Sequence, residues 1–151
     1  MVDERTERDV LYHLVDLCRD GERGFRAAAD HVRDPTLKAL FTELATQRKQ
    51  FAEELLPHLQ RLGSPPLAEG TSAGRLHRQW MTLKGLVPGR HDHHIVTEAE
   101  RGEQVALDAY EDALNGMLPP TVSGLVESQR EAILKATDRI RTVAMGYSHA
   151  D

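Results

Sequence analysis

Four long segments of the chain carry apolar residues at alternating spacings of three and four positions. The first segment shows the pattern at Leu11, Val15 and Cys18, and the same spacing continues to Val32. This spacing brings the apolar side chains to one face of an α-helix. The pattern recurs over residues 37–58, 96–117 and 122–143. No segment alternates apolar and polar residues with a period of two, so the sequence predicts an all-α protein whose amphipathic helices pack together.

Residues that start and stop helices bound each of these segments. Asp34 and Pro35 form an N-cap followed by proline at the first helical position, where its missing N–H costs nothing. Gly63, followed by a Ser-Pro-Pro run, ends the second segment, and Asp92 is the predicted N-cap of the third. A Leu-Pro-Pro-Thr run separates the third from the fourth. The predicted helices cover residues 4–32, 35–61, 93–116 and 121–147.

The lengths of the connections indicate how these helices are arranged. Short connections join the first segment to the second and the third to the fourth, so each pair should form an antiparallel hairpin. A connection over residues 62–92 is long enough to run the length of a bundle, and an amphipathic stretch around Trp80 predicts a short helix within it. The apolar positions of the second segment recur in the fourth at a shift of 85 residues, as Leu37 and Val122 show.

We therefore expect one domain, residues 1–151, with the ferritin-like plan of an up-down four-helix bundle built from two antiparallel hairpins and a long crossover. Periodicity alone leaves other bundle topologies open.

Composition narrows the class of protein. The chain has 151 residues, of which 40% are hydrophobic and 28% charged, as is typical of a folded globular domain. Its formal net charge of −5 argues against nucleic acid as the main partner. The single Cys18 excludes an intramolecular disulfide and a multi-cysteine zinc site. No apolar run approaches the roughly 18 residues that span a bilayer, and the N-terminus lacks signal-peptide character, so we expect a cytoplasmic protein with no membrane partner.

Several polar residues interrupt the apolar stripes, and burying them requires partners. Counting from each hairpin turn places all of them near the middle of the bundle, so one layer of the core should hold carboxylates, a guanidinium and carboxamides. These residues are Glu22 on the first helix, Gln47 and Arg48 on the second, Glu100 and Glu103 on the third and Gln129 on the fourth.

This layer has two interpretations. Carboxylates projecting inward from facing helices hold two iron or manganese ions in ferritin-like bundles, so Glu22, Glu100 and Glu103, with Gln47, are candidate metal ligands. The Glu-x-x-His pairs that complete such a site are absent from the second and fourth helices. Alternatively, Arg48 neutralises Glu22 and Glu103 in a buried cluster that also holds Gln129 and sets the helix register.

Other candidate groups are expected to be structural. His91, His93 and His94 surround Asp92 at the start of the third helix, where we expect an exposed helix end that can bind zinc or nickel adventitiously. Cys18 lies on the core stripe and is interpreted as a small buried hydrophobe. Met117 and Met145 are interpreted as packing residues. Glu7 is interpreted, with its charged neighbours, as part of a solvated helix face.

Several runs of residues resemble a known family. They are PTLKALFTELATQRKQFAEEL (35–55), GRLHRQWMTLKGL (74–86), ERGEQVALDAYEDAL (100–114), LPP (118–120) and DRIR (138–141). These runs look like the bacterial ferritin-like family known as domain of unknown function 2383, over roughly residues 8–145.

The resemblance implies a four-helix ferritin-like bundle in the bacterial cytoplasm, and related families are associated with stress. It points to Glu22, Glu100 and Glu103 as the ferritin-like carboxylates. Gln47 and Gln50 match positions where metal-binding relatives carry Glu and His, and Thr137 stands where similar sequences often carry His.

Three functions follow as hypotheses. The first is a non-enzymatic, stress-associated protein that acts by self-association or partner binding, with a dimer expected through the outward residues Tyr12 and Leu17 of the first helix. The second is a metal-binding protein that handles or oxidises iron with its core carboxylates. The third is a carrier of a small apolar ligand bound near Trp80.

Overall fold

The chain forms four long helices. The computed structural model describes residues 4–63 and 91–148, and every regular element in these ranges is helical, so the prediction of an all-α protein is confirmed. Each helix begins and ends within two residues of its predicted bounds. The helices are α1 (Glu4–His31), α2 (Pro35–Arg61), α4 (His91–Asn115) and α5 (Pro120–Ser148).

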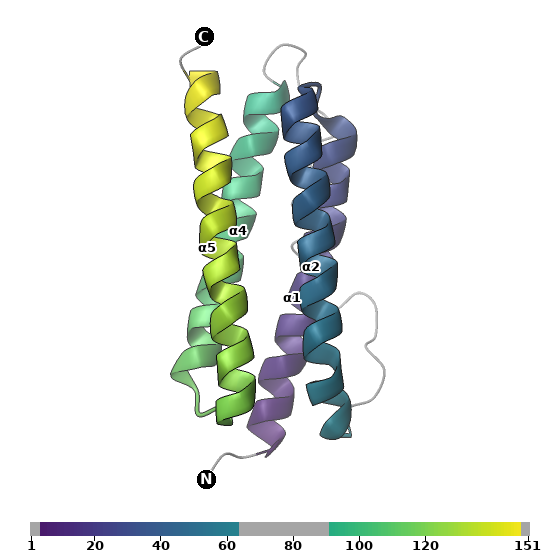
Figure 1. Ribbon diagram of the computed structural model, residues 1–151, viewed down its shortest axis with the longest axis vertical. Coiled ribbons are helices and arrows are strands. Elements are labelled where there is room, and N and C mark those ends of the chain that lie inside the picture. Colours follow the sequence, from purple (N-terminus) through teal and green to yellow (C-terminus); the bar gives the residue numbers. More distant parts are fainter. Residues whose placement is uncertain (1–3, 64–90, 149–151) are drawn as a thin grey trace.

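The helices pack as a four-helix bundle of two antiparallel hairpins, α1–α2 and α4–α5 (Figure 1). α1 packs against α4, and α2 packs less extensively against α5. Arg61, at the end of α2, forms an ion pair of 2.9 Å with Glu7 near the start of α1. Asp92, at the start of α4, lies instead at the α1–α2 turn and accepts hydrogen bonds from the backbone N–H groups of Arg33 and Asp34, both at 2.9 Å. The end of α2 and the start of α4 therefore lie at opposite ends of the bundle.

The segment that connects those two ends, residues 64–90, lies outside the described residues. The predicted short helix around Trp80, and the ligand site expected near that side chain, fall in this segment.

The helix ends of the first hairpin follow the capping rules. Asp34 accepts a hydrogen bond from the N–H of Thr36 at 2.7 Å, and Pro35 occupies the first helical position. Gly63, with a φ of +72°, has the left-handed conformation that ends α2. The prediction that Asp92 is the N-cap of α4 was wrong, because α4 begins at His91 and Asp92 lies within the helix. The Asp92 carboxylate therefore joins the two hairpins instead of capping its own helix.

The apolar core consists of two clusters, one above the other along the bundle. The upper cluster, next to the α1–α2 turn, includes Phe25, Phe41, Ile95 and Ile140. The lower cluster includes Leu11, Leu55, Tyr110 and Ile133. Between them, α1, α2 and α4 contribute no large buried hydrophobic side chain over residues 19–24, 46–50 and 100–105. The polar residues singled out in the sequence lie at or near this break.

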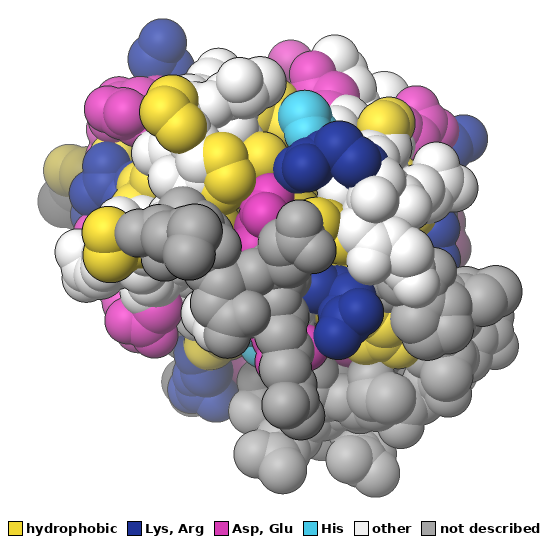
Figure 2. Space-filling view, turned by 90° about the horizontal axis from the view of Figure 1, so that it is seen from below, with side chains coloured by type: hydrophobic (Ala, Val, Ile, Leu, Met, Phe, Trp, Pro, Cys, Tyr) yellow, Lys and Arg dark blue, Asp and Glu magenta, His cyan; other side chains and the backbone are white. Residues whose placement is uncertain are grey.

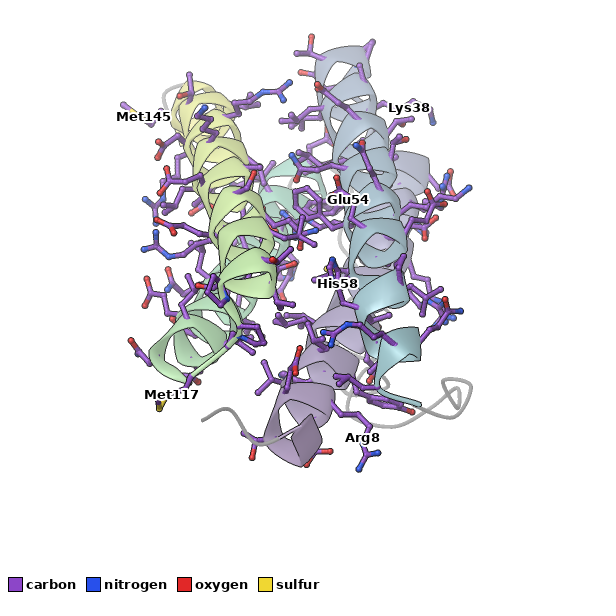
Figure 3. The ribbon with its side chains drawn as sticks, turned by 60° about the horizontal axis from the view of Figure 1, so that its bottom comes forward. Arg8, Lys38, Glu54, His58, Met117 and Met145 are labelled. Atoms are coloured by element: carbon purple, nitrogen blue, oxygen red, sulfur yellow. The ribbon has the colours of Figure 1, made fainter. Side chains whose placement is uncertain are left out.

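Five expectations about burial were wrong. Met117 and Met145 are exposed, at 72% and 63%, and they lie at opposite ends of the molecule (Figure 3). Met117 lies two residues after Asn115, the last residue of α4, so the helical stripe no longer applies to it. Glu7 is buried, at 3% exposure, because α2 and Arg61 cover it. Tyr12 and Leu17 do not face outward but are partly buried against the lower cluster.

Apolar and charged side chains share one end of the molecular surface. At the end of the bundle that carries the α4–α5 turn, apolar side chains are exposed among charged ones (Figure 2). Within the described ranges, no helix is long and apolar enough to cross a membrane.

Candidate functional site

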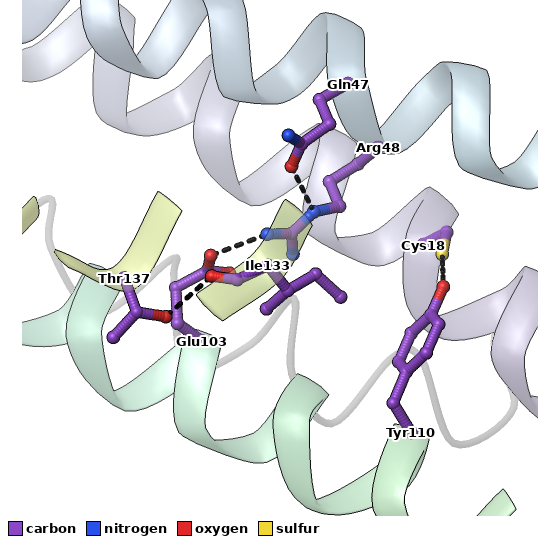
Figure 4. A network of polar contacts seen from close by, with 7 residues as sticks. All are labelled: Cys18, Gln47, Arg48, Glu103, Tyr110, Ile133 and Thr137. Atoms are coloured by element: carbon purple, nitrogen blue, oxygen red, sulfur yellow. Dashed lines mark hydrogen bonds and ion pairs between the residues drawn. The ribbon is translucent and has the colours of Figure 1, made fainter. Parts of the chain in front are cut away.

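A buried ion pair occupies the break between the two apolar clusters. The Arg48 guanidinium on α2 donates from Nη2 to the Glu103 carboxylate on α4 at 2.5 Å (Figure 4). The two residues are 3% and 1% exposed, respectively. Because one partner belongs to each hairpin, the pair connects the two halves of the bundle through the core.

The groups around Arg48 stabilise its positive charge and pack against its side chain. Its guanidinium carbon lies 5.3 Å from the ring centroid of Phe25 and 6.0 Å from that of Phe51, so an aromatic ring from each cluster contacts the charge. Gln47 Oε1 accepts from Arg48 Nε at 3.3 Å. Gly21 of α1 lies against the aliphatic part of the side chain, where a Cβ would be 3.5 Å from Arg48 Cγ. Three helices thus enclose one arginine.

Electrostatics keep this arginine charged. Burial lowers the pKa of Arg48, but the attraction and the hydrogen bond of Glu103 raise it, and the net direction is upward. We call Arg48, Glu103 and Gln47 the ion-pair layer.

A second polar network lies in the lower cluster. Tyr110 on α4 donates its O–H to Gln129 Oε1 on α5 at 2.7 Å, and its oxygen lies 3.1 Å from Cys18 Sγ on α1. The Gln129 amide donates to the Phe51 carbonyl at 3.3 Å and to the Glu54 carboxylate at 3.1 Å, both on α2. Since the Tyr110 proton goes to Gln129, the Cys18 thiol is the donor to Tyr110. This hydrogen-bond chain (Cys18, Tyr110, Gln129 and Glu54) joins all four helices.

Burial disfavours the ionised forms of Cys18 and Tyr110 in this hydrogen-bond chain. It raises the pKa of the Cys18 thiol from 9.0 to about 11. Burial, with the neighbouring Cys18, also raises the pKa of Tyr110 well above its ordinary value. Both groups are therefore neutral at physiological pH, and the thiol is not a nucleophile.

The structure brings together only some of the predicted site residues. Glu103 and Gln47 both contact Arg48. Glu22 is partly exposed and pairs with Arg26 one turn along α1, at 2.8 Å. Glu100 is partly buried, and within the described part of the chain no side chain pairs with it. Gln129 belongs to the hydrogen-bond chain and not to the ion-pair layer, so the expectation of one shared polar layer was wrong.

These residues do not fit a di-metal centre. Such a centre needs carboxylates that converge on one point and whose oxygen atoms are free to bind the metal ions. Here arginine side chains bind Glu103 and Glu22, and they do so at different places. Among the side chains that the structure describes, no three from His, Cys, Asp or Glu are grouped so that they could hold a metal ion. Iron or manganese binding by Glu22, Glu100, Glu103 and Gln47 stays a prediction that this geometry does not support.

The histidine-rich start of α4 is partly described. His93 and His94 are exposed, and His94 Nε2 lies 3.9 Å from Glu98 Oε1. The side chain of His91 lies outside the described residues, so the expectation that it shares a face with His94 stays a prediction.

Three buried polar features were missed by the sequence reasoning. Tyr110 was identified as a core position but not as the centre of a network. Glu7 lies four residues before Leu11, so extending the apolar stripe of α1 by one turn would have found it. Asp16 and Asp20, one turn apart on α1, are also buried, and they lie beside the stripe where no periodic signal marks them.

Fold and site together define the class of protein: an all-α four-helix bundle whose core contains an ion pair between its hairpins. The chain belongs to the family described as domain of unknown function DUF2383, whose model matches residues 6–116. This match includes nearly all of α1 and all of α2 and α4, and with them Arg48, Glu103, Cys18 and Tyr110. A search of curated proteins found no match.

Proposed function

We propose that this chain is a ferritin-like helical module that acts by binding another protein chain, either a partner or a second copy, and not by metal chemistry. The ferritin-like plan is supported by the two hairpins and by the ends of α2 and α4, which lie at opposite ends of the bundle. The proposed link to stress rests on the family resemblance alone.

One observation carries this proposal: the Arg48 guanidinium occupies the place in the core where carboxylates would have to converge on a metal ion. A guanidinium between two aromatic rings repels a divalent cation, and it already holds the Glu103 carboxylate. A metal could enter only if the arginine left a site that three helices enclose, and the cost of moving it opposes binding.

Metal content tests the proposal directly. Untagged protein is purified without chelator from cells grown with added iron and manganese, and bound metals are measured by mass spectrometry. We expect far less than one ion per chain. A His91→Ala/His93→Ala/His94→Ala variant serves as the control for adventitious binding at the start of α4.

The opposite result has a specific form. One or two ions per chain that persist in the histidine variant but disappear in Glu103→Gln would overturn the proposal. That outcome would favour the alternative, a metal-binding protein that handles or oxidises iron with its core carboxylates.

A further inference from the structure

A groove runs between α1 and α4 in the lower half of the bundle. It has a volume of about 450 Å³, and its floor is apolar. Leu14 is fully buried beneath it, Val10 and Ala109 are partly buried, and Val105 is 40% exposed. Val105 is one of three large hydrophobic side chains exposed within the described ranges. The groove therefore leaves apolar surface in contact with water.

The rim of this groove is acidic. Asp9 on α1 and Asp108 and Asp112 on α4 line it, and all three are exposed. Asp108 accepts a hydrogen bond from Gln104 at 3.0 Å, but among the described residues no Lys or Arg pairs with any of the three. His13 is the one lining residue, among those described, that can carry a positive charge. The rim thus places negative charge, which no described Lys or Arg side chain neutralises, beside apolar surface.

A second groove, between α2 and α5, provides a contrast. It is larger, at about 660 Å³, but its charged residues already pair with each other, Arg139 with Glu43 at 2.5 Å. An occupant of that groove would gain no charge partner unless this pair opened. Of these two grooves, only the one between α1 and α4 combines an apolar floor with charge of a single sign that no described Lys or Arg side chain pairs.

We propose that the α1–α4 groove is a docking site for a basic amphipathic helix of a partner protein. This inference rests on the proposed function, since it names the surface and the kind of partner. Apolar side chains of the incoming helix would cover Val105 and Val10, and its Lys or Arg residues would pair with the three aspartates. Charge complementarity selects the partner, because a neutral or acidic helix would leave the rim carboxylates unpaired.

The spacing of the groove residues suits a helix. Val105, Ala109 and Ala113 succeed one another at intervals of four, so the floor follows one face of α4 over about 12 Å. Ala109 is small enough to let a third helix approach closely. Asp108 and Asp112 are also four residues apart, which matches basic residues spaced by one turn on the incoming helix.

The inference is tested with a defined probe. An 18-residue, fluorescein-labelled peptide of leucine and lysine, with leucine at positions i, i+3, i+4 and i+7, is titrated with the full chain and followed by fluorescence anisotropy. We expect saturable binding by one peptide per chain that weakens as salt is raised. The variant Asp9→Asn/Asp108→Asn/Asp112→Asn should weaken binding about tenfold, since each exposed ion pair contributes modestly.

A matched variant controls for overall charge. Asp30→Asn/Glu53→Gln/Asp138→Asn removes three exposed carboxylates elsewhere and should change affinity less than about threefold, because distant exposed charges are screened by salt. Val105→Ser should weaken binding about threefold or more by removing apolar contact from the floor. Circular dichroism confirms that each variant is folded.

Three results would overturn the inference. They are equal loss of affinity in the two triple variants, no saturable binding at 100 μM chain, and a dimer by light scattering that the groove variant dissociates. In the last case a second copy, not a partner helix, occupies the groove. Metal content is measured on the same samples to distinguish failure of this inference from failure of the proposed function. A metal-free chain that does not bind the peptide refutes only the docking site in the groove.

Discussion

Removing Arg48 should destabilise the bundle more than removing Arg48 and Glu103 together. Arg48→Met keeps a long aliphatic side chain but leaves the Glu103 carboxylate, which is 1% exposed, without its cation. Water cannot replace the guanidinium at that depth. Loss of one partner from a buried pair costs about 3–5 kcal/mol of unfolding free energy. The lost contacts with the rings of Phe25 and Phe51 act in the same direction.

The double variant Arg48→Met/Glu103→Leu removes both charges and fills the layer with apolar side chains. Replacing a buried ion pair in this way is often neutral or stabilising, so we expect a stability within about 1 kcal/mol of the wild type, or above it. The surface pair on α1 supplies the control. Glu22 and Arg26 are 21% and 52% exposed, so Arg26→Met should cost less than about 1 kcal/mol.

Urea unfolding at pH 7, followed by far-ultraviolet circular dichroism, measures all of these free energies on one scale. The reasoning fails if Arg48→Met costs less than about 1 kcal/mol, since the Glu103 charge would then be solvated. It also fails if the double variant loses as much stability as the single variants Arg48→Met and Glu103→Leu combined. That outcome would mean that packing, and not charge pairing, makes Arg48 necessary.

Two further predictions concern the other buried polar contacts. Raising the pH from 9 to 11 should lower the unfolding free energy by about 2 kcal/mol through Cys18, because burial raises its pKa from an ordinary 9.0 to about 11 in the folded chain. The folded chain keeps a proton that the unfolded chain releases, so this contribution is intact below pH 9 and lost as the pH approaches 11. Cys18→Ala should show a shallower decline in urea titrations over that range, and an unchanged slope would contradict the assignment. Asp92→Ala should cost about 1.5–3 kcal/mol, because it removes the carboxylate that accepts from Arg33 and Asp34. Thermal unfolding measures that cost, and unchanged hydrogen-exchange protection at those two amides would argue against the contact.

The helices were predictable because local signals determine them. The N-cap at Asp34, the proline after it and the left-handed Gly63 bound α2 without reference to the rest of the chain. The apolar periodicity then identifies which face of each helix is buried. These signals operate over one or two helical turns, so a single sequence contains all of them.

The site was only partly predictable because its contacts join different helices. Periodicity marks Arg48, Glu103 and Gln129 as buried polar residues, but it does not say which of them meet. Glu22 was expected to share the cation of Arg48, yet it reaches Arg26 on its own helix. Gln129 was expected at the level of Arg48, yet it binds Tyr110. A small rotation of each helix decides between such partners, and that rotation depends on the packing of the whole bundle.

The two polar networks determine how the hairpins align. Because apolar positions recur every three to four residues within each helix, apolar packing alone would tolerate sliding one hairpin along the other by one turn, about 5.4 Å. Such a slide would separate Arg48 from Glu103 and Tyr110 from Cys18, and each buried group left unpaired costs about 1–3 kcal/mol, or more where it is charged. The observed register satisfies both networks. The ion pair therefore contributes to the choice of register more than to net stability, which is why its apolar replacement should preserve the free energy of unfolding while admitting other alignments of the hairpins.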